Sequence, residues 1–254
     1  RSSADVIIDT ADTVDINTST TINSLTLGST TPVASILNFN YNAIGNPLTV
    51  SGGDVLVRNG ATIEHTSAAS AVTYVVGLDV TAGDLTVETG GLINVNERGY
   101  STRTRNTGYG PGAAGGGGNI HTGGGAYGGD GGNSGSTAGG AAYGSTTNPV
   151  EYGSAGGSNN YNLTVRNGGG LVRLLVSGTT TVDGIITSNG DNGSNSTFDT
   201  GAAAGGGIYL STGHFQGSGV IRANGGAAYD VGGSASGGRI ALYYATASST
   251  ATPA

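Results

Sequence analysis

The sequence predicts an all-β fold, a right-handed parallel β-helix (β-solenoid) with glycine-rich insertions at one corner. Three observations favour this fold. Val, Ile, Leu and Ala alternate with Thr, Ser and Asn, which is typical of strands. Short strand-like segments recur, each closed by Gly, Asn or Asp. Glycine makes up 51 of the 254 residues and gathers between these segments, without the strict triplet period of collagen.

The first strand-like segments form two triplets. "LTVSGGD", "VLVRNGA" and "TIEHTSA" are followed by "LDVTAGD", "LTVETGG" and "LINVNERG". Three short strands per unit predict a coil in which each strand pairs with its equivalent one turn away, roughly 4.8 Å distant. Apolar side chains would point inward and Thr, Asn and Ser outward. The six segments begin at Leu48, Val55, Thr62, Leu78, Leu85 and Leu92.

A longer repeat lies towards the C-terminus. "LVSGTTTVDGIITSNG" (Leu175–Gly190) matches "LSTGHFQGSGVIRANG" (Leu210–Gly225), with the leading leucines aligned. "GGGIYL" (Gly205–Leu210) then recurs as "GGRIAL" (Gly237–Leu242). Repeats of equal length with matched corners favour a solenoid with one continuous core. An antiparallel β-sandwich is the alternative, since it also has short strands with regular turn signals.

The chain divides into an N-terminal strand or capping segment over 1–46 and the solenoid over 47–254. Glycine-rich insertions at about 97–160, 190–207 and 225–238 each leave the coil at the same place in the repeat. Insertions at one corner lie side by side, often on the binding face. We expect ordered glycine strands packed on each other, because only glycine lets backbones approach so closely. Mobile surface loops are the alternative.

The order of these motifs resembles a known group of proteins. The series G-[ILV]-I-x-x-N-G, a glycine-rich excursion and G-G-x-I-x-L is similar to the glycine-rich parallel β-helix repeats of large bacterial secreted and surface proteins, over about Leu78–Tyr244. The excursions are also similar to the polyglycine-helix layers of some phage tail-tip adhesins. This resemblance implies an adhesin-like or structural surface role and little chemistry.

Composition excludes several classes of function. Cys is absent, so disulfides and thiolate chemistry are excluded. No apolar run is long enough to form a membrane-spanning helix. The net charge of −7 argues against nucleic acid, whose phosphates need a basic surface. An acidic, Lys-free chain rich in Ser, Thr and Asn indicates a secreted, extracellular or cell-surface protein.

The long insertion carries the candidate ligand contacts. Its arginines, with Glu97, form the densest charge cluster and would suit an acidic glycan. Its tyrosines could stack on sugars, although packing between glycine strands is the simpler role for them. The candidate ligand-binding residues are Tyr100, Arg103, Arg105, Tyr109, Tyr127 and Tyr143.

Calcium is the one cofactor that the sequence leaves open. "GGDGGNSG" and "NGDNGSNSTFD" resemble calcium-binding glycine nonapeptides, although the Asp does not recur at the required spacing. Asp191, Asn192, Asn195 and Asp199 offer the hard oxygen ligands that calcium prefers. Asx turns would explain the same residues. The three histidines lack the spacing of a zinc site.

The expected function is that of an extracellular structural protein without catalysis, either a self-assembling filament subunit or a surface adhesin. The strands at the two ends of the coil carry unpaired donors and acceptors, so copies could join head to tail into an open polymer. One stretch of a longer coil is the alternative. The candidate assembly residues are Val6, Ile7, Ile8, Ile240, Leu242 and Tyr244.

Two other functions are alternatives to this one. The first is a glycan-binding or lyase-like, glycan-cleaving β-helix protein, for which the paired carboxylates of glycoside cleavage are sparse here. The second is an ice-binding solenoid, suggested by Thr179–Thr181. Ice binding needs a regular threonine array over many turns, and these turns are irregular. The expected partners are therefore further copies of the chain and surface glycans.

Overall fold

The computed structural model describes residues 4–67, 74–101, 108–116, 121–158, 166–194, 200–248 and 252–253. Within these ranges the chain forms strands and no helix, and so no helix there could cross a membrane. All pairings between the named strands are parallel. The prediction of an all-β fold with parallel strands is confirmed.

The strands form two sheets. In the first sheet, one row of strands is β3 (Thr21–Ile22), β6 (Leu48–Val50) and β9 (Val76–Val80). A second row is β1 (Asp5–Ile8), β4 (Ser24–Leu27), β7 (Val55–Val57) and β10 (Leu85–Val87). Both rows continue into the long strands β12 (Leu171–Val182), β14 (Gly207–Gln216) and β16 (Arg239–Ala247).

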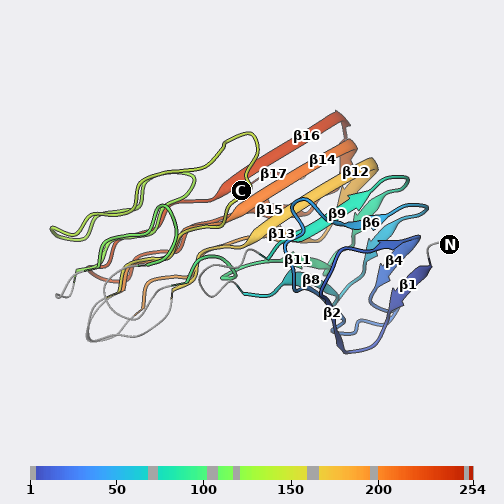
Figure 1. Cartoon of the computed structure of the whole chain (residues 1–254), viewed down its shortest axis with the longest axis horizontal. Coiled ribbons are helices and arrows are strands. Elements are labelled where there is room, and N and C mark those ends of the chain that lie inside the picture. Colours follow the sequence, from blue (N-terminus) through green and yellow to red (C-terminus); the bar gives the residue numbers. More distant parts are fainter. Residues whose placement is uncertain are drawn as a thin grey trace.

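The second sheet is a third row, stacked in the order β17-β15-β13-β11-β8-β5-β2. Its members are β2 (Thr13–Ile16), β5 (Ile36–Phe39), β8 (Thr62–His65), β11 (Leu92–Asn94), β13 (Ile185–Thr187), β15 (Val220–Arg222) and β17 (Thr252–Pro253). The chain visits the three rows in turn, so each strand pairs with its equivalent one turn later (Figure 1). This arrangement fits a β-solenoid.

The register agrees with the two sequence triplets. Leu48 lies opposite Leu78, and Val55 lies opposite Leu85. Strands β1 to β5, in the N-terminal segment 1–46, pair into the same two sheets. That segment therefore contributes turns to the coil rather than a separate layer.

The longer repeat needs one correction. Leu210 lies opposite Leu174, and Leu175 lies opposite Ser211. The register shifts between Val176 and Thr179, and from Thr179 onward the pairing agrees with the sequence alignment. A β-bulge adds one residue to one strand, so an alignment without gaps cannot match both halves.

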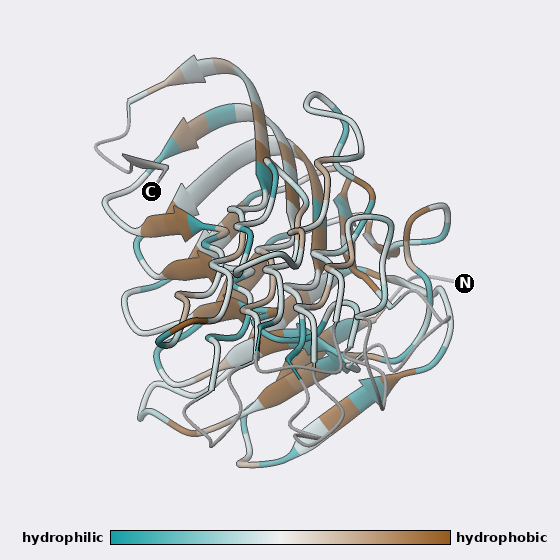
Figure 2. Ribbon diagram, turned by 90° about the vertical axis from the view of Figure 1, so that its left-hand side faces the viewer, coloured by the Kyte–Doolittle hydropathy of each residue, from teal (hydrophilic) through white to brown (hydrophobic). Residues whose placement is uncertain are grey.

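Apolar side chains alternate inward along the strands, as the sequence predicted. In β9, Val76, Leu78 and Val80 are buried while Asp79 is half-buried. The inward residues of all three rows form one core cluster. Figure 2 shows the brown, hydrophobic segments mainly on the strands, whereas the glycine-rich trace is mostly near-white, so the apolar residues are concentrated in the coil.

The described glycine-rich segments join β11 to β12, β13 to β14 and β15 to β16. They extend away from the strands and run side by side (Figure 1). They lie outside regular strands, yet their backbone groups are hydrogen-bonded to one another. We call the described parts 108–116, 121–158, 188–194, 200–206 and 223–238 the glycine layer.

Hydrogen bonds in the glycine layer repeat every third residue. The N–H groups of Gly123 and Ala126 donate to the carbonyls of Gly115 and Gly112. The carbonyls of Gly123 and Ala126 in turn accept from the N–H groups of Gly157 and Ser154. On a second side, the carbonyls of Thr122 and Gly125 accept from the N–H groups of Gly233 and Ser236. On a third side, the carbonyls of Gly124 and Tyr127 accept from the N–H groups of Gly140 and Tyr143. A three-residue period with bonds between, not within, segments is the pattern of polyproline II-like helices.

Close main-chain approach explains the composition of the layer. A Cβ atom added at Gly201 would lie 1.8 Å from the carbonyl oxygen of Gly123. At Gly140 it would lie 1.9 Å from the carbonyl oxygen of Gly112. Any side chain there would force the segments apart and break their hydrogen bonds.

Candidate functional site

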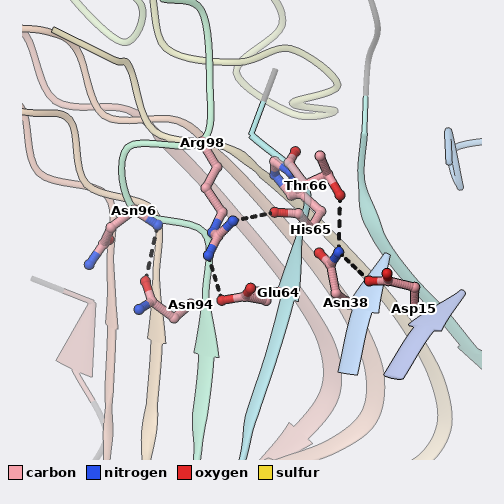
Figure 3. Close-up of polar contacts among 8 residues, drawn as sticks. All are labelled: Asp15, Asn38, Glu64, His65, Thr66, Asn94, Asn96 and Arg98. Atoms are coloured by element: carbon pink, nitrogen blue, oxygen red, sulfur yellow. Dashed lines mark hydrogen bonds and ion pairs between the residues drawn. The ribbon is translucent and has the colours of Figure 1, made fainter. Parts of the chain in front are cut away.

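A polar cluster lies at the C-terminal ends of β8 and β11, and beyond β11 the chain continues towards the glycine layer (Figure 3). The Arg98 guanidinium donates to the His65 carbonyl (2.9 Å) and pairs with the Glu64 carboxylate (2.5 Å). On the neighbouring turn, the Asn38 amide donates to Asp15 (2.7 Å) and to the Thr66 hydroxyl (3.0 Å). The cluster thus joins successive strands of the second sheet.

The His65 side chain is fully buried and both of its nitrogens are hydrogen-bonded. Nε2 accepts the N–H of Leu171 (3.1 Å), so Nδ1 carries the proton and donates it to the Thr66 carbonyl (2.8 Å). The pKa of His65 is lowered to about 3, mainly by burial; the Thr66 hydrogen bond raises it in part, and the charge of Arg98 adds to the lowering. The imidazole is therefore neutral and joins β8 to the first residue of β12.

Side-chain oxygens also cap the backbone of the next turn. Asn96 Oδ1 accepts the N–H of Asn189 (2.6 Å), and Asn189 Oδ1 accepts the N–H of Asn224 (2.8 Å). At another corner, Asp84 Oδ1 accepts the N–H of Thr179 (2.6 Å). Stacked Asn and Asp residues therefore satisfy backbone donors where the strand ladder is interrupted.

Tyrosines fill the junction between the coil and the glycine layer. Tyr127 is fully buried, and its ring lies 4.8 Å from that of Tyr143. Tyr152 is stacked on His65 at 5.7 Å and meets Tyr100 edge-on at 5.4 Å. Burial is the main cause that raises the pKa values of all four phenols. These rings provide the side-chain volume that glycine segments lack.

This placement bears on the predicted ligand contacts. Tyr127 has no exposed surface on which a sugar could stack, whereas Tyr100, Tyr109 and Tyr143 are partly exposed. Tyr143 is held in place, because its hydroxyl donates to the Tyr152 carbonyl and accepts from Ser154 (2.9 Å). The predicted contacts Arg103 and Arg105 lie outside the described residues.

The predicted calcium ligands are only partly described. Asp191 pairs with Arg166 through both carboxylate oxygens at 3.2 Å, and burial raises its pKa against the effect of that arginine. Asn192 Oδ1 accepts the N–H of Ala227 (2.8 Å). Both side chains thus bond within the protein, and Asn195 and Asp199 lie outside the described residues.

The predicted assembly residues lie on strands at opposite ends of the coil. In β1, Ile7 is 66 % exposed, while Val6 and Ile8 line an apolar hollow of about 130 Å³. In β16, Ile240 and Leu242 are partly buried, and Tyr244 is 51 % exposed. Four of the six large apolar side chains found exposed among the described residues lie on β1, β2 or β16: Ile7, Val14, Tyr243 and Tyr244.

Sequence reasoning missed the cluster around His65. Glu64 and His65 lie far from Arg98 and Leu171 along the chain, and the alternation of β8 was the only local signal that His65 points inward. Chemically, neither nitrogen of this histidine is free to accept or deliver a proton, so the cluster couples turns of the coil. No family model matches the chain, and neither a curated protein nor a solved structure was found to be similar to it.

Proposed function

We propose that the chain is a structural, non-catalytic module of a secreted or cell-surface protein, and that it adds head to tail to further copies of itself. The coil would be right-handed, as parallel crossover connections almost always are, with the glycine layer leaving from one corner. Its resemblance to glycine-rich repeats of bacterial surface proteins supports this role.

The observation that carries the proposal is the distribution of exposed apolar side chains. They gather on the strands at the two ends of the coil, where only one edge of each strand is paired within the described chain. At one end, Val6 and Ile8 leave part of the core open as an apolar hollow. A second copy would cover this hollow and continue the parallel ladder, because β16 is paired along only one edge among the described residues.

The contact would be heterologous, since β1 and β16 are different surfaces. Two variants of the full chain test this directly: Val6→Asp, which places a charge in the apolar hollow at one end, and Tyr244→Asp at the other. We expect the unmodified chain to form oligomers that lengthen with concentration in light scattering and electron microscopy. Each variant alone should remain monomeric, because a buried unpaired charge is costly.

Mixing the two variants gives the sharper test. Each variant keeps one intact end, so the mixture should form dimers and nothing longer. Val231→Asp is the matched control, because Val231 is 38 % exposed in the glycine layer, away from both ends, and should leave assembly unchanged. An unmodified chain that stays monomeric at high concentration, or a single variant that still dimerises, would contradict head-to-tail assembly.

A further inference from the structure

A small cavity lies on the outer face of the first sheet, away from the ends of the coil. Its volume is about 240 Å³. Its floor is formed by Asp79 of β9 and by Arg173 and Leu175 of β12, and its wall by Ile44 and Pro47 from the connection between β5 and β6.

The register explains why the cavity forms. Asp79 lies opposite Leu175, and Arg173 lies opposite Gly77. A Cβ atom at Gly77 would come within 2.5 Å of the Ala43 Cβ, so the glycine lets the connecting segment pack down on the sheet as a wall. The three floor side chains alternate with inward core residues and therefore all point outward.

Arg173 is held in a fixed position. Its guanidinium carbon lies 4.3 Å from the centre of the Tyr209 ring, and one of its N–H groups donates to Asn148 (3.0 Å). On the other side, the Tyr209 ring packs against Tyr243 at 5.6 Å. A guanidinium has five N–H donors, so this support orients it and leaves donors for a ligand.

Asp79 shares the cavity with Arg173, but the two do not form an ion pair. Among the residues that the structure describes, none is hydrogen-bonded to the Asp79 carboxylate. The cavity thus combines an available acceptor, an oriented donor and the apolar surface of Leu175, Ile44 and Pro47.

We propose that this cavity binds one neutral sugar residue of a glycan. It is smaller than the roughly 300–1,000 Å³ typical of drug-sized sites, which suits a single ring. Asp79 accepts hydrogen bonds from sugar hydroxyls, Arg173 donates to sugar oxygens, and the C–H face of the ring lies on Leu175 and Pro47. An acidic sugar would bring its carboxylate close to Asp79. Glycan binding at this cavity does not depend on head-to-tail assembly.

The test uses the full chain and neutral methyl glycosides of glucose, galactose, mannose and N-acetylglucosamine. Each is titrated by NMR, following the backbone amides of Gly45 and Gly77 and saturation transfer to the sugar. We expect at least one glycoside to shift these amides. Asp79→Asn and Arg173→Gln should each weaken its binding by about tenfold or more, as expected for loss of a hydrogen bond to a charged group.

Arg222→Gln is the matched control, because Arg222 lies on β15 of the other sheet and bonds to Thr187; it should bind the glycoside as the unmodified chain does. Tyr209→Leu should weaken binding without abolishing it, since Tyr209 only orients Arg173. Unchanged midpoints of thermal unfolding confirm that the variants fold. If Asp79→Asn does not fold, Asp79→Ala replaces it in the binding test. No response to any glycoside, equal binding by the Asp79 and Arg173 variants, or preference for a free amino acid would overturn the proposal.

Discussion

In the coil, neighbouring turns are joined by strand ladders and also stack their side chains in the core: Leu78 is enclosed between Leu48 and Leu174 on the adjacent strands. In the glycine layer, neighbouring segments meet main chain to main chain, as Gly123 does with Gly201. The coil gains stability from burial of apolar area. The layer has little such area and relies on hydrogen bonds between segments that leave no room for a side chain. The two regions are therefore stabilised in different ways: the coil is sensitive to loss of side-chain volume, and the glycine layer is sensitive to its addition.

Removing side-chain volume should harm the coil most. Leu78→Ala is expected to lower the free energy of unfolding by about 2–5 kcal/mol, through lost burial and the cavity left behind. Urea denaturation measures the loss. Leu175→Ala is the control, because that leucine belongs to the same row of strands but points outward. Similar losses for the two variants would show that the inner core does not dominate stability.

The buried histidine should make the junction between the two regions sensitive to acid. The pKa of His65 is about 3 in the folded chain and about 6.5 when unfolded. The stability that this neutral histidine contributes is therefore fully present above pH 6.5, and it is lost as the pH falls from 6.5 towards 3, because the unfolded chain binds the proton first. Between pH 6.5 and 4.5 we expect a loss of about 2 kcal/mol.

Urea denaturation at several pH values tests this. His65→Gln should remove most of this pH dependence, because glutamine can donate and accept hydrogen bonds but does not titrate in this range. His214→Gln should retain it, because His214 bonds to Thr246 and Ser248 at an exposed position. Acid sensitivity that persists in the His65 variant would assign the effect to other groups.

Adding a single methyl group should harm the glycine layer. Gly201→Ala is expected to cost roughly 1–3 kcal/mol, because the methyl collides with main chain that cannot rotate away. Gly129→Ala is the control in the same layer, where the nearest atom to the added Cβ lies at 3.8 Å. Hydrogen exchange should show faster exchange around Gly123 and Gly157 in the first variant only. Equal exchange in both variants would contradict the packed layer.

The smallest effect is expected at the corners that join the two regions. Asn189→Ala removes the acceptor for the N–H of Asn224 and should cost about 1 kcal/mol. Asn46→Ala, at an exposed position, should cost nothing measurable. Thermal denaturation compares the melting temperatures of these two variants with that of the unmodified chain. If both variants melt at the same temperature as the unmodified chain, the stacked asparagines contribute no stability.

Sequence patterns predicted the coil well because its physics is local. Leu48 and Leu78 start segments of the same length with the same alternation, and they pair as expected. The alignment of Leu175 with Leu210 was wrong by one residue, because a bulge changes register without changing composition. Glycine content indicated that segments could pack closely, but not which segments, because glycines carry no side chains to distinguish their partners.

The candidate sites were harder to predict for a related reason. Asp79 and Arg173 come together only because the chain returns to the same row after the long insertion. Arg98 reaches His65 in the same way, across one turn. Neither pair forms a recognisable spacing in the sequence. The tyrosines were visible as a group, but only the fold shows that Tyr127 is buried.

The hydrogen bonds of the glycine layer also set an order of events during synthesis. Gly125 donates to Ala202 and accepts from Ser236, so its partners leave the ribosome long after it does. At roughly 5–20 residues per second the wait lasts several seconds. The first turns, up to β11, can close meanwhile, because their strands pair with near neighbours in the sequence. Apart from its tyrosines, the waiting segment is mainly glycine, alanine, serine and threonine, so it exposes little apolar surface before its partners arrive.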